Sequence, residues 1–93
     1  MLSVENKKFH IVCEGQTLQE IAVYYSVSEY LLVRLNGLSK PPFAGQILRI
    51  PSERGNAYIV REGDTKTLLC GSIEGYEKKN GTDIFYIGMR VIL

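Results

Sequence analysis

Residues 10–22 read HIVCEGQTLQEIA, and this stretch decides the fold. Its β-branched and apolar beginning predicts a strand over residues 9–13, and Glu14-Gly15-Gln16 predicts the turn that leaves it. Thr17 and Glu20 have the spacing of a capping box, in which each side chain satisfies a backbone N–H that the start of a helix leaves unpaired. A helix is therefore expected to begin directly after Thr17.

Two helices and a second strand are expected downstream. The first helix carries an apolar stripe at helical period, made by Leu18, Ile21, Ala22 and Tyr25. Ser28 is expected to cap a second helix that ends at Asn36-Gly37. Its buried stripe is predicted to be Leu31, Leu32 and Leu35. Residues 46–50 predict a strand that Pro51 stops, so the order is β-α-α-β, with the strands antiparallel and both helices on one face.

This pattern occurs twice. Residues 10–17 align with 58–65, Asn36-Gly37 with Asn80-Gly81, and residues 45–50 with 88–93. The predicted fold class is α+β, with two tandem β-α-α-β units. The predicted organisation is an N-terminal tail at 1–8, a first unit at 9–51, a polar linker at 52–56 and a second unit at 57–93.

The second unit is shorter than the first. Four residues are missing in the equivalent of 23–27, and Gly75, Tyr76 and Lys79 stand where the first unit has its three leucines. A buried leucine contributes roughly 1.5–3 kcal/mol, and Gly75 weakens a helix. We therefore expect that the second unit does not fold without the first.

Strand alternation predicts which side chains lack a cover. Val12, Leu48 and Ile50 are expected to face the helices. The opposite faces of the two sheets are expected to carry Phe9 or Ile11, Cys13 and Ile47 in the first unit, and Ile59 and Ile92 beside Arg61 and Arg90 in the second. A two-stranded sheet with an apolar outer face needs a cover. Packing of the units on each other, or of two chains, is the expected solution.

Composition excludes several classes of function. The 93 residues carry a net charge of +1, which argues against nucleic-acid binding. Residues 1–8 lack the apolar core of an export signal, and no apolar run predicts a membrane span. Two cysteines and one histidine argue against a metal site, and no nucleophile has the partners of a catalytic triad. We predict no enzyme activity and no cofactor.

The first unit resembles a LysM domain, the lysin motif found in proteins that bind peptidoglycan or chitin. The resemblance rests on His10-x-Val12, Gly15-Gln16-Thr17-Leu18, Ile21-Ala22, Leu32-x-x-Leu35-Asn36 and Gly45-Gln46-x-Leu48-x-Ile50-Pro51. His10 replaces the usual aromatic residue of that family and Gln16 the usual Asp. The second unit looks like a shortened and degenerate copy, in which Lys66 replaces the apolar residue after Gly63-Asp64-Thr65.

The resemblance implies a groove for a glycan that contains N-acetylglucosamine, between the loop before the first helix and the loop after the second. The implied glycan-binding residues are Gly15, Gln16, Thr17 and Leu18 on one side and Leu38, Ser39, Lys40, Pro41 and Phe43 on the other. The weaker second-unit set is Gly63, Asp64, Thr65, Ile84 and Phe85. The structural alternative is that Gly15 and Thr17 only make a turn and a cap, and that Phe85 and Tyr86 fill a thin core, which we favour for the second unit.

Two functions stay open. The first is a non-catalytic module that binds peptidoglycan, or less readily chitin, and anchors a protein to the bacterial cell wall. The second is a protein–protein interaction module, in a spore coat or a phage-like tail, that forms a homodimer or binds a protein partner through the apolar sheet face. The resemblance implies a location at the cell wall or spore, and the missing leader suggests the cytoplasm.

Overall fold

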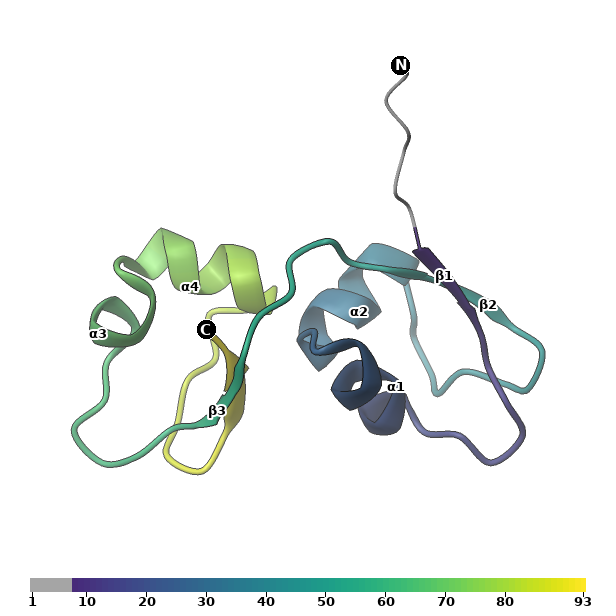
Figure 1. Ribbon diagram of the computed structural model, residues 1–93, viewed down its shortest axis with the longest axis horizontal. Coiled ribbons are helices and arrows are strands. Elements are labelled where there is room, and N and C mark those ends of the chain that lie inside the picture. The colour runs from purple at the N-terminus through teal and green to yellow at the C-terminus, as the bar shows by residue number, and fades with distance from the viewer. Residues whose placement is uncertain (1–7) are drawn as a thin grey trace, which may run out of the picture.

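The computed structural model describes residues 8–93, in which two antiparallel two-stranded sheets, each with two helices, lie side by side (Figure 1). The elements of residues 8–51 are called the first unit and those of residues 57–93 the second unit. The first unit contains β1 (Lys8–Ile11), α1 (Leu18–Tyr25), α2 (Glu29–Asn36) and β2 (Ile47–Ile50). The second contains β3 (Ala57–Ile59), α3 (Lys66–Cys70), α4 (Ile73–Asn80) and β4 (Arg90–Ile92). The predicted tail lies outside the described residues except for Lys8, which begins β1. The predicted α+β class and element order are confirmed.

Each unit has its own two-stranded antiparallel sheet, as predicted. β1 pairs with β2 with His10 opposite Leu48, and β3 pairs with β4 with Tyr58 opposite Val91. In both sheets the strand entering the unit lies against the strand that leaves it. The two helices of each unit therefore lie in the connection between its paired strands.

An asparagine holds the second helix of each unit to the returning strand. The Asn36 side chain accepts a hydrogen bond from the Arg49 N–H (2.7 Å) and donates to the Arg49 and Leu32 carbonyls (2.9 Å each). Asn80 makes the same three bonds to Ile92 and Tyr76, at 2.8–3.1 Å. Each amide thus satisfies one residue of the strand in both directions and ties it to the last turn of the helix.

The core of the first unit confirms most of the expected inward faces. Its buried members are Val12, Ile21, Ala22, Val27, Leu32, Leu48 and Ile50. The prediction that Leu31 and Leu35 belong to the buried stripe is wrong, because Leu35 is 40% exposed and Leu31 is only partly buried. α2 is only two turns long, and Leu32 is its one buried residue among those described.

This result changes how much core packing the second unit is expected to lack. Tyr76, the counterpart of Leu32, is fully buried with Val60, Met89 and Val91. The two leucines that the second unit lacks therefore correspond to positions that contribute little core packing in the first. The structure also explains why position 75 is a glycine, because an added Cβ would lie 2.9 Å from the Cys70 carbonyl oxygen.

The four missing residues shorten the first helix, as predicted. α1 has eight residues and α3 has five. α3 ends at Gly71 in the left-handed conformation (φ 86°), and Ser72 then caps α4 by accepting from the Gly75 N–H (2.8 Å). The close turn between α3 and α4 places Cys70 against the small core.

The second sheet lies between its own helices and the first unit (Figure 1). Ile92, expected on the outer face of this sheet, is fully buried even though it faces away from the core cluster that contains Val91. Gly55 in the linker lies directly over Ile92 and Leu93, where an added Cβ would overlap the Leu93 carbonyl oxygen. The linker therefore covers Ile92, whereas Ile59, which was expected on the same outer face, is 53% exposed.

Hydrogen bonds fix the contact between the units. The Ser28 hydroxyl donates to the Asn80 carbonyl (2.6 Å) while it accepts from the Leu31 N–H (3.3 Å), so it caps the end of α4 and the start of α2 together. Arg90 donates to the Val27 carbonyl (3.0 Å), and the Arg34 side chain donates to Gly81 (3.1 Å). Opposite helix ends are joined, which favours this contact electrostatically.

The outer face of the first sheet has no such cover within residues 8–93. Phe9, Ile11 and Ile47 are 55%, 63% and 62% exposed, and Cys13 is exposed beside them. The two thiols are free, so the units carry no disulfide within the described chain. The expectation of an apolar, uncovered outer face is confirmed for the first unit.

Residues 57–93 expressed alone are expected to be largely unfolded, because Ile92 loses the cover of Gly55 and the end of α4 loses its hydrogen bond from Ser28. Dispersion of amide signals in a two-dimensional NMR spectrum measures this directly. The matched control is residues 8–56, which keep the larger core and are expected to show dispersed signals. Native-like dispersion from residues 57–93 alone would contradict the dependence.

Candidate functional site

The turn into α1 is held by the side chains of His10 and Gln16, the two positions at which the sequence departs from the usual LysM residues. The side-chain amide oxygen of Gln16 (Oε1) accepts from the Cys13 N–H (3.0 Å) and is hydrogen-bonded to His10 Nε2 (2.8 Å). His10 Nδ1 in turn contacts the Tyr25 hydroxyl (2.8 Å). His10 is therefore a half-buried residue that ties the turn to α1.

The second unit makes the same turn with Tyr58 and Asp64. The Asp64 carboxylate accepts from the Arg61 N–H and from the Tyr58 hydroxyl, both at 2.7 Å. The backbone N–H bond and the Tyr58 bond lower the pKa of Asp64, and the bond to Asp64 raises the pKa of Tyr58. The same turn is thus held by a His10–Gln16 pair in the first unit and by a Tyr58–Asp64 pair in the second.

The start of α1 leaves backbone donors free. Thr17 accepts from the Glu20 N–H (3.1 Å), and Glu20 accepts from the Thr17 N–H (2.8 Å), which confirms the predicted capping box. The first N–H groups of a helix have no partner within the helix. After the box is made, the N–H groups of Leu18 and Gln19 are the ones without an intrahelical acceptor.

The loop between α2 and β2 faces this helix start. Leu38 is fixed by its N–H bond to the Val33 carbonyl (3.1 Å), and Phe43 accepts from the Gln46 N–H (3.0 Å) at the other end. Within residues 8–93, no backbone–backbone hydrogen bond uses the groups of residues 39–42. This segment therefore presents its carbonyl groups without a backbone partner.

The two loops enclose one cavity of about 540 Å³. Seven predicted site residues line it together: Gln16, Thr17, Leu18, Leu38, Ser39, Lys40 and Pro41. Gly15 and Phe43 lie outside the lining; Gly15 makes the turn with φ 78°, and Phe43 is 65% exposed. The volume is within the range of small-molecule sites, roughly 300–1,000 Å³.

Four lining residues were not predicted: Gln19, Glu29, Val33 and Pro42. Glu29 and Val33 are four residues apart on α2 and so share one face of it. That spacing is visible in the sequence. Which face of α2 meets the start of α1 is decided by the packing of the helices.

In the second unit, side chains of the unit itself fill the space between the corresponding loops. The Tyr76 hydroxyl donates to the Ile84 carbonyl (2.6 Å), and Phe85 packs edge-to-face on Tyr76 at 5.3 Å between ring centroids. Burial raises the pKa of Tyr76 to about 12, so this hydroxyl stays protonated. Lys66, at the position of Leu18, places its ammonium 5.4 Å from the Tyr76 ring. Phe85 thus packs against the core, as predicted, whereas the prediction that Tyr86 fills the core is wrong, because Tyr86 is 56% exposed.

The family comparison matches the first unit. Residues 10–51 match the family model described as LysM domain. Residues 10–51 are a LysM domain. LysM domains are binding modules for glycans that contain N-acetylglucosamine, such as peptidoglycan or chitin. The predicted resemblance of the first unit is confirmed, and residues 57–93 lie outside the match.

Solved structures similar to the chain include two spore cortex-lytic enzymes named SleL. The chain is 22% identical to the Bacillus cereus enzyme with a TM-score of 0.46, and 24% identical to the Bacillus megaterium QM B1551 enzyme with a TM-score of 0.47. Each comparison covers 94% of this chain and 22% of the enzyme's chain. No curated protein matches the chain.

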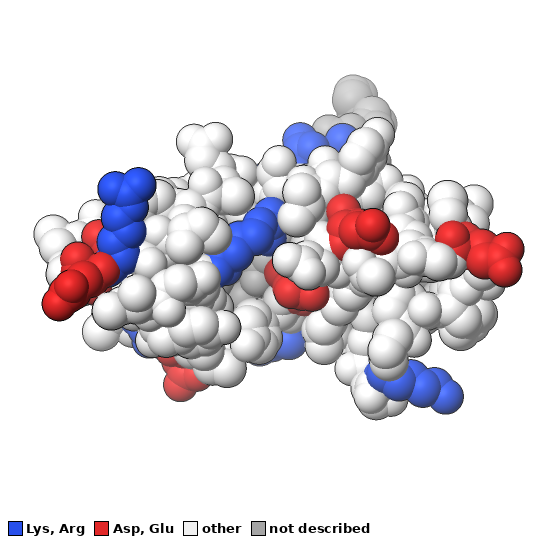
Figure 2. Space-filling view, turned by 90° about the horizontal axis from the view of Figure 1, so that it is seen from below, with Lys and Arg blue, Asp and Glu red and all other residues white. Residues whose placement is uncertain are grey.

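The surface near the LysM domain carries no dominant charge. Figure 2 shows acidic and basic side chains interspersed on one face of the molecule. In the described part of the chain, no group of three or more His, Cys, Asp or Glu side chains is arranged to hold a metal ion. None of the helices in residues 8–93 has the length and hydropathy needed to cross a membrane.

Acid is expected to weaken the turn at Asp64. Because folding lowers the pKa of this carboxyl below its ordinary value of 3.8, its contribution is present above that value and is lost as the pH falls through the folded pKa. Asp64→Asn should therefore lose less stability than the parent between neutral and strongly acidic pH, as measured by urea unfolding. Tyr58→Phe keeps the Arg61 bond and should lie between them, and identical acid profiles of Asp64→Asn and parent would contradict the assignment.

Proposed function

We propose that the LysM domain binds an N-acetylglucosamine-containing glycan, peptidoglycan rather than chitin, in the cavity between the start of α1 and the α2–β2 loop. The observation that carries this proposal is the convergence of these two loops, with unpaired backbone groups on both sides. The module has no catalytic role and anchors its protein to the bacterial cell wall.

The chemistry of an acetamide fits this lining. Its carbonyl oxygen accepts from the free N–H groups of Leu18 and Gln19, and its N–H donates to a free carbonyl within residues 39–42. The side chains of Leu18, Leu38 and Pro41 offer apolar surface to the faces of the sugar ring. A neutral ligand needs no charge partner, in agreement with the net charge of +1.

We further propose that residues 57–93 are a second, degenerate LysM-like unit. The support is the repetition of particular bonds: the asparagine bonds to the returning strand and the side-chain bond across the turn. Its own site, with Gly63, Asp64, Thr65, Ile84 and Phe85, contributes little to glycan binding. The Ile84 carbonyl is already used by Tyr76, and Phe85 packs against the core.

Filling the cavity should abolish binding without unfolding the domain. Ser39→Trp places a bulky ring in the cavity from an exposed loop position, and binding of N-acetylglucosamine oligomers should weaken at least tenfold, about 1.4 kcal/mol. Isothermal calorimetry measures the affinity. The matched control is Ser52→Trp, an exposed serine in the linker outside the cavity, which should bind as the parent does.

Two further measurements complete this test. Chemical-shift changes on titration should be concentrated at residues 15–18 and 38–44. Pull-down with insoluble peptidoglycan and with chitin then ranks the two glycans. Equal binding by Ser39→Trp and Ser52→Trp, or retention on neither polymer, would overturn the proposal.

The second candidate function is protein–protein interaction in an assembled structure such as a spore coat or phage-like tail. The uncovered face that carries Phe9, Ile11 and Ile47 favours it, because these three large apolar side chains are more than half exposed on one face of the sheet. A second copy of the chain covering this face would bury three large apolar side chains.

If this function holds, the chain forms a concentration-dependent dimer through the first sheet. Analytical ultracentrifugation should show the dimer for the parent and a monomer for Ile47→Lys, because a charge would be placed in the buried contact. Val23→Lys is the control, since Val23 is 52% exposed on α1, away from this face. A parent that is monomeric at all concentrations would exclude the dimer.

A further inference from the structure

A second cavity of about 470 Å³ lies between the two units and is continuous with the proposed glycan groove. The two cavities share four lining residues: Leu18, Gln19, Glu29 and Val33. The shared residues come from the first turn of α1 and the first turns of α2. The LysM groove therefore does not end at α2 but opens along that helix toward the second unit.

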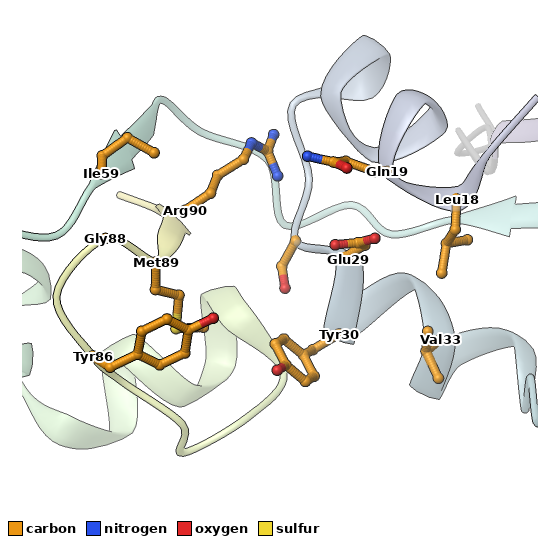
Figure 3. A pocket seen from close by; sticks show the side chains of 11 residues that line it. Leu18, Gln19, Glu29, Tyr30, Val33, Ile59, Tyr86, Gly88, Met89 and Arg90 are labelled. Carbon is orange, nitrogen blue, oxygen red and sulfur yellow. The ribbon is translucent and has the colours of Figure 1, made fainter.

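Two tyrosines from different units flank this second cavity. Tyr30 on α2 is 39% exposed, and Tyr86 in the loop before β4 is 56% exposed. Figure 3 shows the two rings on the same side of the cavity, one from each unit, with Met89 above Tyr86. Exposed aromatic rings in a concave site offer flat apolar faces with a polar hydroxyl at the edge, which suits the C–H face of a sugar.

The polar groups of the cavity are balanced in charge. Arg90 reaches from β4 toward the first unit and donates to the Val27 carbonyl at 3.0 Å. Glu29 is near enough to Arg90 to act on it electrostatically, and Gln19 adds a neutral amide. One cation and one anion with an amide favour an uncharged ligand that is rich in hydroxyl groups over a charged one.

The walls of this cavity are held in a fixed relation. The Ser28 hydroxyl joins α2 to the end of α4, and Arg90 joins β4 to the α1–α2 connection. Gly81 packs against the backbone of Leu31, where an added Cβ would lie 2.7 Å from its Cα. A ligand that spans both units therefore meets a preformed surface and does not have to bring the units together.

We propose that the glycan bound in the LysM groove continues into this inter-unit cavity, where its further sugar residues bind against Tyr30 and Tyr86. The inference rests on the proposed function and deepens it. The second unit then serves the first as one wall of a longer groove, in place of a second separate site. The ligand is accordingly a strand of several N-acetylated sugars and not a single sugar or a short fragment.

The test compares oligomers of N-acetylglucosamine from the dimer to the hexamer by calorimetry on the full chain. Affinity of the parent should rise as the oligomer becomes long enough to pass Leu18 and Val33. Tyr86→Ala and Tyr30→Ala should each weaken the hexamer about five- to tenfold and leave the dimer unchanged. Tyr86→Phe keeps the ring and should retain most of the hexamer affinity.

Tyr24→Ala is the matched control, because Tyr24 is a 77% exposed tyrosine on α1 outside both cavities. Thermal unfolding of each variant verifies that it is folded. Dimer and hexamer binding with equal affinity, and unchanged by Tyr86→Ala and Tyr30→Ala, would overturn the extension while leaving the LysM groove intact. Failure of every oligomer to bind would instead overturn the proposed function, and the extension with it.

Discussion

The covering of the second sheet is the constraint on which the rest of the structure depends. Two strands and two short helices bury only one face of a sheet, and such a small unit is marginal by itself. Here Gly55 of the linker covers Ile92, which is fully buried although it faces away from its own core. The first unit adds the Ser28 hydroxyl, which satisfies a carbonyl at the end of α4. Stability and the relative placement of the units therefore have one cause.

The two units share a set of bonds more than a set of residues. Asn36 and Asn80 make the same three hydrogen bonds, while the turn into the first helix is made by a histidine–glutamine pair in one unit and a tyrosine–aspartate pair in the other. The histidine–glutamine pair keeps the geometry that the Asp64 carboxylate provides in the second unit. What both pairs preserve is the position of the loop that precedes the helix, and in the LysM domain that loop forms one wall of the groove.

Shortening of α3 has consequences for function as well as for packing. With a smaller core, the second unit uses Tyr76 and Phe85 to fill its interior, and Tyr76 takes up the Ile84 carbonyl. Its own groove is thereby occupied, and Tyr86 and Arg90 are directed to the cleft shared with the first unit. The groove of the first unit is open and that of the second is filled. This difference arises because the second unit has fewer apolar side chains with which to build its core.

The sequence by itself determined the features that depend on neighbours along the chain. Several features were predictable because each rests on local hydrogen bonds or on strand and helix periods. They are the capping box at Thr17, the turn glycines, the alternation that buries Val12 and Leu48, and the antiparallel closure by residues 46–50. The placement of Leu18 and Leu38 in one groove was implied by the resemblance to LysM domains, and both line the cavity. Only the tertiary structure decided that Leu35 is exposed, that Ile92 is covered, and that Tyr30 and Tyr86 lie on one cleft. These outcomes depend on the angle at which helices and units pack, and that angle is set by side chains far apart in sequence.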